Sequence, residues 1–532
     1  MTRLTLAIAV LASVGTTGAV AQSRLHVEVS EAVQQDTLPS LRDVVSRPED
    51  FRKMRNRVEH DLPLPEVPAD QIDGAIQSSA ERPAFAQGAM APTAIGSVDG
   101  VGKGFSGPQG AFTVQFAPPD TVGAVGATQY VQVVNTGLAV FSKATKSVIH
   151  GPVPTNALWS GFGGGCETNN DGDATVVYDK AAGRWVISQF SVSTTPYLQC
   201  VAVSQTSDAT GAYNRYAFSY GNTAFPDYPK TGVWPDGYYT TFNIFNGNSF
   251  GGAKLCAYNR AAMLSGAAAT QQCFQLSTSF GGVLPSDLDG STAPPAGSPN
   301  YLVNFGANSL NLWKFHVDWT NTANTTLAGP TNIPVAAFTA ACNGGACIPQ
   351  SGTSQKLDSL ADRLMFRLAY RNIGGSESLV VSHSVTTGTT RKDQHTGVRW
   401  YELRSPGTAP TVRQQSSYSP DSNYRWMSSV AMDKLGDMAL GYSVSSSTMH
   451  PAVRYTGRLA GDPLNTMQAE ASMIEGGGSQ SGNRLTRWGD YSAMSIDPVD
   501  DCTFWYTNEY LQANGSFNWS TRIGSFKFAG CQ

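Results

Sequence analysis

The chain has 532 residues and a formal net charge of −4 at pH 7, so it offers no general basic field for binding nucleic acid. Charged residues make up 14% of it, against roughly 25% in typical soluble domains, while glycine occurs 54 times and aromatic residues reach 10%. A chain rich in glycine and aromatic residues and poor in charge favours an exported β protein.

Residues 1–21 have the pattern of a secretory signal peptide. Arg3 supplies a positive start, an apolar run extends from Leu4 to Val14, and Ala19 and Ala21 form a small-residue cleavage site. The apolar run is too short to cross a bilayer. We therefore expect a secreted protein, extracellular or periplasmic, without a membrane span. A retained membrane anchor is the alternative.

Residues 22–107 differ from the rest of the chain. Ser46 and Glu49 match a capping box, and Phe51, Met54 and Val58 fall on one helical face, which predicts a short helix. The following stretch, 63–107, is rich in Pro, Ala and Gly and predicts a linker. The extension is interpreted as a tether or a packed helix, with a removable pro-segment as the alternative.

From residue 108 onward the chain repeats itself. Residues 425–443 align with 487–505 without a gap, and 225–243 fits the same frame of strand, turn and strand. The first polar or aromatic anchor of each repeat recurs at intervals of 53 to 73 residues, at Asp120, Asp173, Asp227, Asp289, Asp362, Trp426 and Asp490. The pattern predicts an all-β fold, a β-propeller over residues 108–532, with seven blades preferred and six or eight as alternatives.

Two resemblances agree with this fold. The stretches 118–135, 227–239 and 487–510 resemble an uncharacterised family of secreted bacterial β-propeller proteins, which implies the fold and no reaction. More weakly, Ser495, Asp497, Thr503 and Trp505 resemble the Asp-box hairpin of sialidase-type propellers, although the spacing is stretched and the glycine is missing. Asp boxes are structural, so this resemblance implies fold and not activity.

The eight cysteines of an exported chain favour disulfide bonds. A sequential pairing would close a short loop within one structural unit each time, joining Cys166 to Cys200, Cys256 to Cys273, Cys342 to Cys347 and Cys502 to Cys531. We expect no dedicated metal site, since the sequence contains no His-Glu-x-x-His and no Cys-x-x-Cys.

The repeat anchors precede the inner strands, so we expect them at the mouth of the central channel. Carboxylates brought together raise one another's pKa and can supply an acid and a base. The predicted catalytic residues are Asp227, Asp490 and Asp173, with Glu377 added because it interrupts a β-rich segment. The alternatives are loop caps that accept backbone amides, or a Ca²⁺ site.

Basic and aromatic residues near the anchors predict a substrate-binding set of Arg487, Lys230, Arg367, Tyr228 and Tyr491. Arginine grips carboxylates bidentately, and tyrosine supplies a base or a stacking face. Pairing of the arginines with aspartates of adjacent blades is the alternative.

These features predict a secreted carbohydrate-active enzyme, similar to glycoside hydrolases, that acts on an extracellular polysaccharide or other glycan at the channel. The alternatives are a non-catalytic propeller that binds glycan or protein, and a polysaccharide lyase on an acidic glycan.

Overall fold

The computed structural model describes residues 25–44, 57–58, 64, 71–77, 91–388, 390 and 392–532. The predicted signal peptide and most of the predicted N-terminal helix lie outside these residues. The described chain is all-β, as predicted, and its α-helices are the short α2 (Gly164–Thr168) and α3 (Arg260–Ser265).

Antiparallel meanders of four strands form the main sheets. The first is β8 (Val122–Val125), β9 (Gln129–Val134), β10 (Gly137–Ser142) and β11 (Val148–Pro154). The second is β12 (Thr175–Asp179), β13 (Arg184–Ser191), β14 (Leu198–Ser204) and β15 (Tyr213–Ser219). The third is β16 (Ala224–Val233), β17 (Tyr238–Asn246), β18 (Ser249–Tyr258) and β19 (Thr270–Gln275).

The next two meanders share one eight-stranded sheet, because their first strands pair in parallel. They are β20 (Leu284–Leu288), β21 (Asn300–Gly306), β22 (Ser309–His316) and β23 (Thr326–Pro334), followed by β26 (Met365–Ile373), β27 (Ser376–Thr387), β28 (His395–Arg404) and β29 (Thr411–Tyr418). The sixth meander is β30 (Tyr424–Met432), β31 (Met438–Ser446), β32 (Met449–Arg458) and β33 (Ala471–Ile474). The seventh contains β34 (Ala493–Ile496), β35 (Phe504–Leu511) and β36 (Trp519–Lys527). Short ladders are formed by β5 (Ser106–Gly107) with β6 (Gly110–Ala111), before the first meander, and by β24 (Ala346–Gln350) with β25 (Thr353–Asp358), between β23 and β26.

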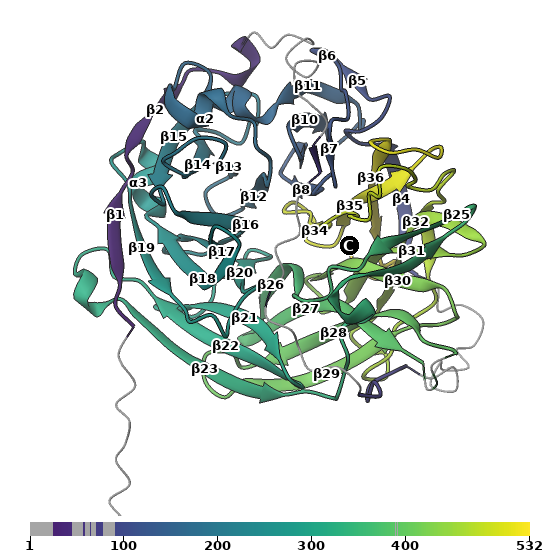
Figure 1. Cartoon of the computed structure of the whole chain (residues 1–532). Coiled ribbons are helices and arrows are strands. Elements are labelled where there is room, and N and C mark those ends of the chain that lie inside the picture. The colour runs from purple at the N-terminus through teal and green to yellow at the C-terminus, as the bar shows by residue number, and fades with distance from the viewer. Residues whose placement is uncertain are drawn as a thin grey trace, which may run out of the picture.

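The first strand of each meander lines a central channel. These inner strands contact one another in chain order, and β34 contacts β8, so the sheets close into a ring. Figure 1 shows the sheets arranged radially around this centre. The fold is therefore a β-propeller, as predicted. The described residues supply seven such inner strands, and the preferred number of seven blades stays a prediction.

Aromatic side chains pack between neighbouring sheets. Tyr455 of β32 stacks on Phe526 of β36 with ring centroids 3.9 Å apart. Tyr130 of β9 stacks on Trp505 of β35 at 5.3 Å, which joins the first sheet to the last. A blade is covered on both faces by its neighbours, so its middle strands are buried along their whole length, as β35 is. Trp505 is therefore structural, as predicted.

The turns that follow the inner strands confirm the structural role predicted for their aspartates. Asp497 accepts the amide of Val499 at 2.9 Å and the indole N–H of Trp505 at 3.3 Å. Asp433 accepts the amides of Leu435 and Asp437 at 2.9 and 3.0 Å. A short carboxylate that bonds its own backbone fits a tight hairpin turn.

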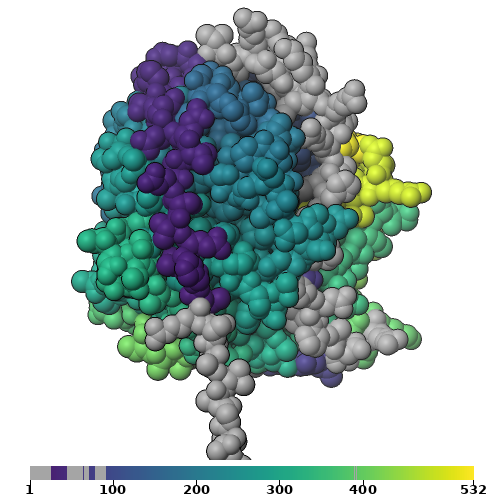
Figure 2. All heavy atoms as spheres, turned by 60° about the vertical axis from the view of Figure 1, so that its left-hand side comes forward, coloured from purple at the N-terminus to yellow at the C-terminus, as the bar shows by residue number. Residues whose placement is uncertain are grey.

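The N-terminal extension is built into the sheets, which corrects the predicted linker. Thr93–Asp99 forms β4 and pairs with β36, so the last sheet contains both an early and a late strand of the chain. Further strands extend the outer edges, β1 (Glu28–Glu31) on β19 and β2 (Gln34–Leu38) on β15. Figure 2 shows this purple segment lying across the outside of two sheets. The cause is that outer strands present unpaired N–H and C=O groups that added strands satisfy.

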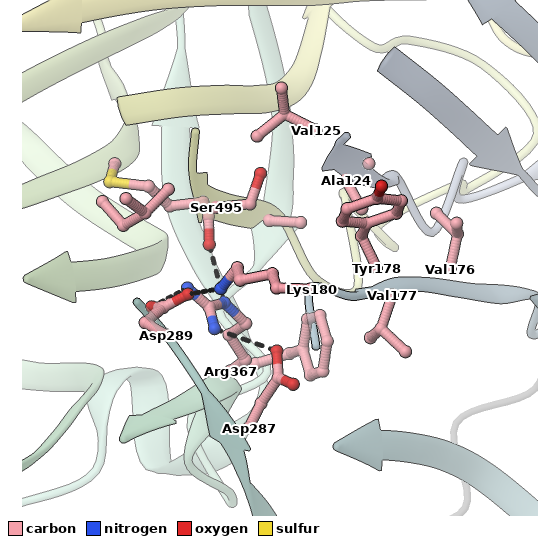
Figure 3. A pocket seen from close by; sticks show the side chains of 15 residues that line it. Ala124, Val125, Val176, Val177, Tyr178, Lys180, Asp287, Asp289, Arg367 and Ser495 are labelled. Carbon is pink, nitrogen blue, oxygen red and sulfur yellow. Dashed lines mark hydrogen bonds and ion pairs between the residues drawn. The ribbon is translucent and has the colours of Figure 1, made fainter. Parts of the chain in front are cut away.

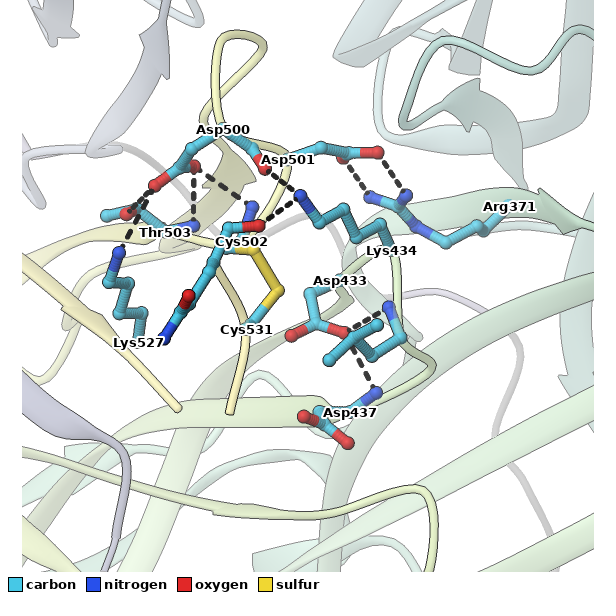
Figure 4. Close-up of a disulfide and its surroundings, with 12 residues drawn as sticks. Arg371, Asp433, Lys434, Asp437, Asp500, Asp501, Cys502, Thr503, Lys527 and Cys531 are labelled. Carbon is cyan, nitrogen blue, oxygen red and sulfur yellow. Dashed lines mark hydrogen bonds and ion pairs between the residues drawn. A yellow bond between two sulfur atoms is a disulfide. The ribbon is translucent and has the colours of Figure 1, made fainter. Parts of the chain in front are cut away.

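All four disulfides join the cysteines as predicted, Cys166 to Cys200, Cys256 to Cys273, Cys342 to Cys347 and Cys502 to Cys531. The last one ties residues beyond β36 to the β34–β35 turn (Figure 4). Lys434 of the neighbouring sheet donates to the carbonyls of Asp500 and Gln532 at 3.0 and 2.6 Å, so this corner also holds two sheets together.

Replacing Cys502 and Cys531 together by alanine is expected to cost about 3 to 4 kcal/mol of unfolding free energy, because the bond closes a loop with a sequence separation of 29 residues. Removing the Cys342–Cys347 bond, with a separation of 5 residues, is the matched control, and the same loop-entropy relation gives it only about 2 kcal/mol. Thermal melting of both double variants checks which of the two losses of stability is larger. A smaller loss for the Cys502–Cys531 variant would contradict it.

Candidate functional site

Five of the predicted anchors meet at the end of the channel where the inner strands begin. We call this group the channel-mouth cluster: Asp120, Asp173, Asp227, Tyr228, Lys230, Asp362, Arg363, Arg487, Asp490 and Tyr491. Asp120, Asp173 and Asp490 each act electrostatically on Lys230, and Asp173, Arg363 and Arg487 act on Asp227. Four predicted substrate-binding residues that lie close to these anchors in the sequence are also here, namely Tyr228, Lys230, Arg487 and Tyr491.

Four residues of the cluster share the same left-handed backbone conformation. Asp120, Asp173, Tyr228 and Asp490 have φ of 49°, 45°, 56° and 61°, in the left-handed region. In β16 the pairing with β17 is interrupted between Asp227 and Lys230. A bulge of this kind bends a strand and re-aims its side chains. The amide of Tyr228 is thereby presented to Asp173, whose Oδ2 accepts it at 3.0 Å.

Each arginine of the cluster binds a neighbouring carboxylate. Arg363 donates from Nε and Nη2 to the two oxygens of Asp362, at 2.7 and 3.0 Å. Arg487 binds Asp490 in the same manner, with Nε 3.0 Å from Oδ1 and Nη2 on Oδ2. Burial raises the pKa of Asp490, and Arg487 opposes this effect. Both pairs have the bidentate geometry that fixes arginine and carboxylate in one orientation.

Lys230 is held between two aromatic rings. Its Nζ lies 3.4 Å from the ring centroid of Tyr228 and 3.7 Å from that of Tyr491, and it donates to the carbonyl of Pro229 at 3.0 Å. The side chain is fully buried. Burial lowers the pKa of Lys230 to about 8, against the opposing pull of Asp173, Asp120 and Asp490.

Asp227 differs from the other acids of the cluster. Like Asp362, it is half-buried and so retains access to solvent, but its pKa and its partners differ. Loss of hydration, followed by the negative charge of Asp173, raises the pKa of Asp227 to about 7. Among the described residues its carboxyl group has no hydrogen-bond partner and no ion pair. It is therefore an acid that can carry a proton near neutral pH.

Glu509 was not predicted and lies directly behind the cluster. Its Oε2 accepts the amide of Gly489 at 2.6 Å, next to Asp490. The side chain is fully buried, and burial raises the pKa of Glu509 well above its ordinary value. It thus supports the turn that presents Asp490. A glutamate inside the strand FWYTNEYL, which is buried along its whole length, was the available signal.

Arg367 and Asp289 lie deeper in the channel, which corrects their predicted place at the mouth. Arg367 donates to Asp287 at 2.9 Å, to Asp289, and across the channel to the carbonyl of Met494 at 2.8 Å (Figure 3). Lys180 also binds Asp289. Arg367, Asp287 and Asp289 are buried and Lys180 is half-buried, and the four groups pair with one another around a cavity of about 20 Å³. Asp289 follows β20 instead of preceding it, and Gly282, with φ of 58°, precedes that strand.

Glu377 and Trp426 lie outside the channel-mouth cluster, where they were predicted. Glu377 lies at the start of β27, next to the β26–β27 turn, so the length of β26 separates it from Arg363. There it accepts hydrogen bonds from Tyr301 and Tyr370 at 3.2 and 2.8 Å. The structure therefore does not bring it to the cluster. Trp426 is fully buried against Trp488, with ring centroids 6.0 Å apart, and is structural.

Within the described ranges, no three His, Cys, Asp or Glu side chains are placed so that they could hold a metal ion. The same part of the chain contains no helix long and apolar enough to span a membrane.

No protein-family profile and no curated protein matches the chain. The solved structures that it resembles include the N-terminal domain of Nup159, with 8% identity over 89% of this chain and 100% of that one, at a TM-score of 0.33. A polysaccharide lyase, an ulvan lyase bound to its saccharide, matches with 11% identity over 80% of this chain and 97% of that one, at a TM-score of 0.33. A Trypanosoma rangeli sialidase in complex with the inhibitor DANA matches with 11% identity over 67% of this chain and 54% of that one, at a TM-score of 0.29.

Carbohydrate-active enzymes are thus among the structural neighbours, at low identity. Since every one of these TM-scores is below 0.5, the likenesses carry no argument about function.

Proposed function

We propose that the chain is a glycoside hydrolase that acts on an extracellular glycan at the channel-mouth cluster, with Asp227 as general acid. The observation that supports this proposal is the state of Asp227, a half-buried carboxyl whose pKa is raised to about 7. A general acid works best when its pKa lies near the operating pH.

The proposed chemistry divides the work between two carboxyl groups. Asp227 donates its proton to the glycosidic oxygen as the bond from that oxygen to the anomeric carbon breaks. Asp173, the acid whose charge acts most strongly on Asp227, serves as the second carboxylate and takes a proton from the water whose oxygen bonds to the anomeric carbon. Glycoside hydrolysis needs such a pair on either side of the scissile bond. Tyr228 and Tyr491, with ring centroids 5.6 Å apart, form an aromatic wall beside them.

A non-catalytic glycan-binding propeller is the second candidate, and one observation favours it. Asp173 accepts the amide of Tyr228, and Asp362 accepts the amide of Leu64 at 3.3 Å, so two of the cluster acids also act as loop caps. In this alternative the cluster positions loops and a sugar without breaking a bond.

We also propose that the chain is exported. Its four disulfides support this, because such bonds form and persist in oxidising compartments.

The test is to assay the purified chain against a panel of polysaccharides for new reducing ends and for unsaturated uronate. We expect reducing ends alone. kcat/KM should fall as pH rises through about 7, because Asp227 must be protonated to act and loses its proton above that pH.

Asp433→Asn is the matched control for the pH profile. Burial and then the charge of Asp437 raise the pKa of Asp433 to about 7 as well, but it lies in the turn at the opposite end of its inner strand. The profile should be unchanged in this variant. Unsaturated products would instead identify a lyase, and retention on a glycan without new reducing ends would identify a binding module.

A further inference from the structure

The aromatic rings inside the channel-mouth cluster are closed to a sugar. Tyr228 and Tyr491 have 4% and 0% of their surface exposed, and their rings enclose the ammonium group of Lys230. A sugar ring packs its C–H face on an aromatic ring only where that ring is open to solvent. These two rings can bound the site, but a stacking surface for the glycan has to lie elsewhere on the mouth of the channel.

Two half-buried aromatic residues lie beside Asp227. Phe225 stands two residues before Asp227 in β16, so the two side chains leave the strand on the same face. This face is turned towards the preceding sheet, because Phe225 contacts the ring of Phe190 in β13 at 6.0 Å, and because Asp173, which precedes β12 of that sheet, acts on Asp227. Tyr197, between β13 and β14, is also half-buried and meets Phe225 at a centroid distance of 5.8 Å and an angle of 86°. We call Tyr197 and Phe225 the aromatic pair.

The loop that presents Tyr197 is held in place by hydrogen bonds. Asp171 accepts the amides of residues 192 and 193, both at 2.7 Å. The amide of Tyr197 donates to the carbonyl of Gly221 at 2.8 Å, and the carbonyl of Tyr197 accepts the amide of Tyr220 at 2.9 Å. A ligand that binds a preorganised ring does not have to order it at an entropic cost.

The segments around the aromatic pair contain hydroxyl and amide groups and no charged side chain. Residues 192–197 read VSTTPY, and residues 219–226 read SYGNTAFP. Thr194, Asn222 and Thr223 are exposed there and can form hydrogen bonds with sugar hydroxyls. These segments offer no counter-charge to an acidic or a basic sugar, so the surface suits a neutral one.

From these observations we propose that the aromatic pair is a glycan subsite, on which a neutral pyranose residue stacks next to the bond that is cleaved at Asp227. The inference rests on the proposed function for the position of that bond. It names the substrate class of the site, a neutral polysaccharide. Stacking on the pair does not itself require hydrolysis, so the two proposals can fail separately.

The direct test is calorimetric binding of four hexasaccharides to the full chain at pH 6. Three are neutral, made of β-1,4-linked glucose, mannose or xylose, and the fourth is made of α-1,4-linked galacturonate. We expect at least one neutral hexasaccharide to bind at least tenfold tighter than the galacturonate. Raising NaCl should leave the affinity for that neutral hexasaccharide unchanged, because its binding pairs no charges.

Variants of Tyr197 separate stacking from other roles of the side chain. Tyr197→Ala should weaken binding of the preferred neutral hexasaccharide at least tenfold. Tyr197→Phe keeps the ring and should restore the affinity, whereas Tyr197→Leu is apolar without being flat and should resemble the alanine variant. Phe225→Ala tests the second ring in the same way, and thermal melting of each variant shows whether it is folded.

Tyr424→Ala is the matched control. Tyr424 stands two residues before Trp426, as Phe225 stands two residues before Asp227, and it is also half-buried. Its ring contacts another aromatic ring, that of His395, at 6.2 Å. Its strand β30 begins the third sheet after that of β16, away from the aromatic pair. Its replacement should leave the affinity for the hexasaccharide within about twofold.

Kinetics on a hydrolysed glycan give a second measurement. Tyr197→Ala should raise KM at least tenfold with little change in kcat, because a stacking contact made equally in the ground state and the transition state acts on binding alone. The pH at which kcat/KM falls should stay where it is in the unmodified chain, since Asp227 is untouched.

Tightest binding of galacturonate, no binding of any neutral hexasaccharide, or undiminished binding in both alanine variants of the pair would overturn the subsite. Turnover that depends on Asp227 would then leave the hydrolase in place. Neutral binding that depends on the pair, without new reducing ends from any glycan, would overturn the hydrolase and leave the subsite standing.

Discussion

Asp227→Asn is expected to lower kcat on the hydrolysed glycan by about 100-fold or more, because a positioned general acid contributes roughly 10² to 10⁴ in rate. Asparagine has nearly the same shape but carries no acidic proton. Asp227 has no hydrogen-bond partner among the described residues, so the substitution breaks no described contact, and the melting temperature should remain within the equivalent of about 1 kcal/mol.

Reducing-end assays and thermal melting of the same preparation check both expectations. Glycan binding should persist in Asp227→Asn, which separates loss of chemistry from loss of the site. Asp433→Asn is again the control, and it should retain full turnover. Full turnover of Asp227→Asn would remove the general acid from the mechanism and leave the glycan-binding propeller as the better interpretation.

The sequence predicts the ring better than it predicts the site. The repeat frame places Asp433 and Asp497 in equivalent turns, and their carboxylates bond the backbone as that position requires. The same frame assigns Asp120, Asp173, Asp227 and Asp490 to one end of the channel. Repetition makes this possible, because one correct alignment fixes the end of every inner strand.

The errors arise where the repeat is irregular. Asp289 stands before the longest interval between anchors, which extends to Asp362, and the frame places it on the wrong side of β20. The partners of the arginines could not be predicted either, because Arg367 of β26 is paired with Asp287 and Asp289, which lie in or directly after β20, a strand some 80 residues earlier in the chain that pairs with β26 in parallel. Spacing along a chain does not show which charges meet across a channel.

The N-terminal strands were missed for a different reason. The strand β1 is exposed at every residue, and β2 at all but its last. Neither shows the alternation of apolar and polar residues by which a strand is found in a sequence. Their pairing depends on backbone hydrogen bonds to β19 and β15, and such bonds can form whatever the side chains of the added strands are.

The residues from 71 to 77 show how firmly this extension is attached. Asp73 binds Arg399 of β28, and its Oδ2 accepts the hydroxyl of Ser417 at 2.5 Å. Both charged side chains are completely buried. The amide of Ser417 donates to the carbonyl of Ala75 at 2.7 Å, which extends the β29 edge by a further strand-like segment.

Asp73→Ala is therefore expected to lower the unfolding free energy by about 3 kcal/mol, because it leaves the guanidinium of Arg399 buried without its carboxylate. Arg399 retains the carbonyl of Ala336 at 3.1 Å and Ser417 at 2.6 Å, which places the cost at the lower end for a broken buried pair. Denaturant unfolding of the purified variant measures the loss.

Glu475→Ala is the matched control for Asp73→Ala. Glu475 also binds an arginine, with Arg454 Nε at 3.0 Å, but half of its side chain is exposed. Solvent screens an exposed pair, so its removal should cost at most about 1 kcal/mol. Equal losses for the two variants would mean that the N-terminal segment is not held by the buried pair. A large loss for Asp73→Ala alone would show that the extension is part of the folded propeller and that the protein cannot shed it as a pro-segment without losing stability.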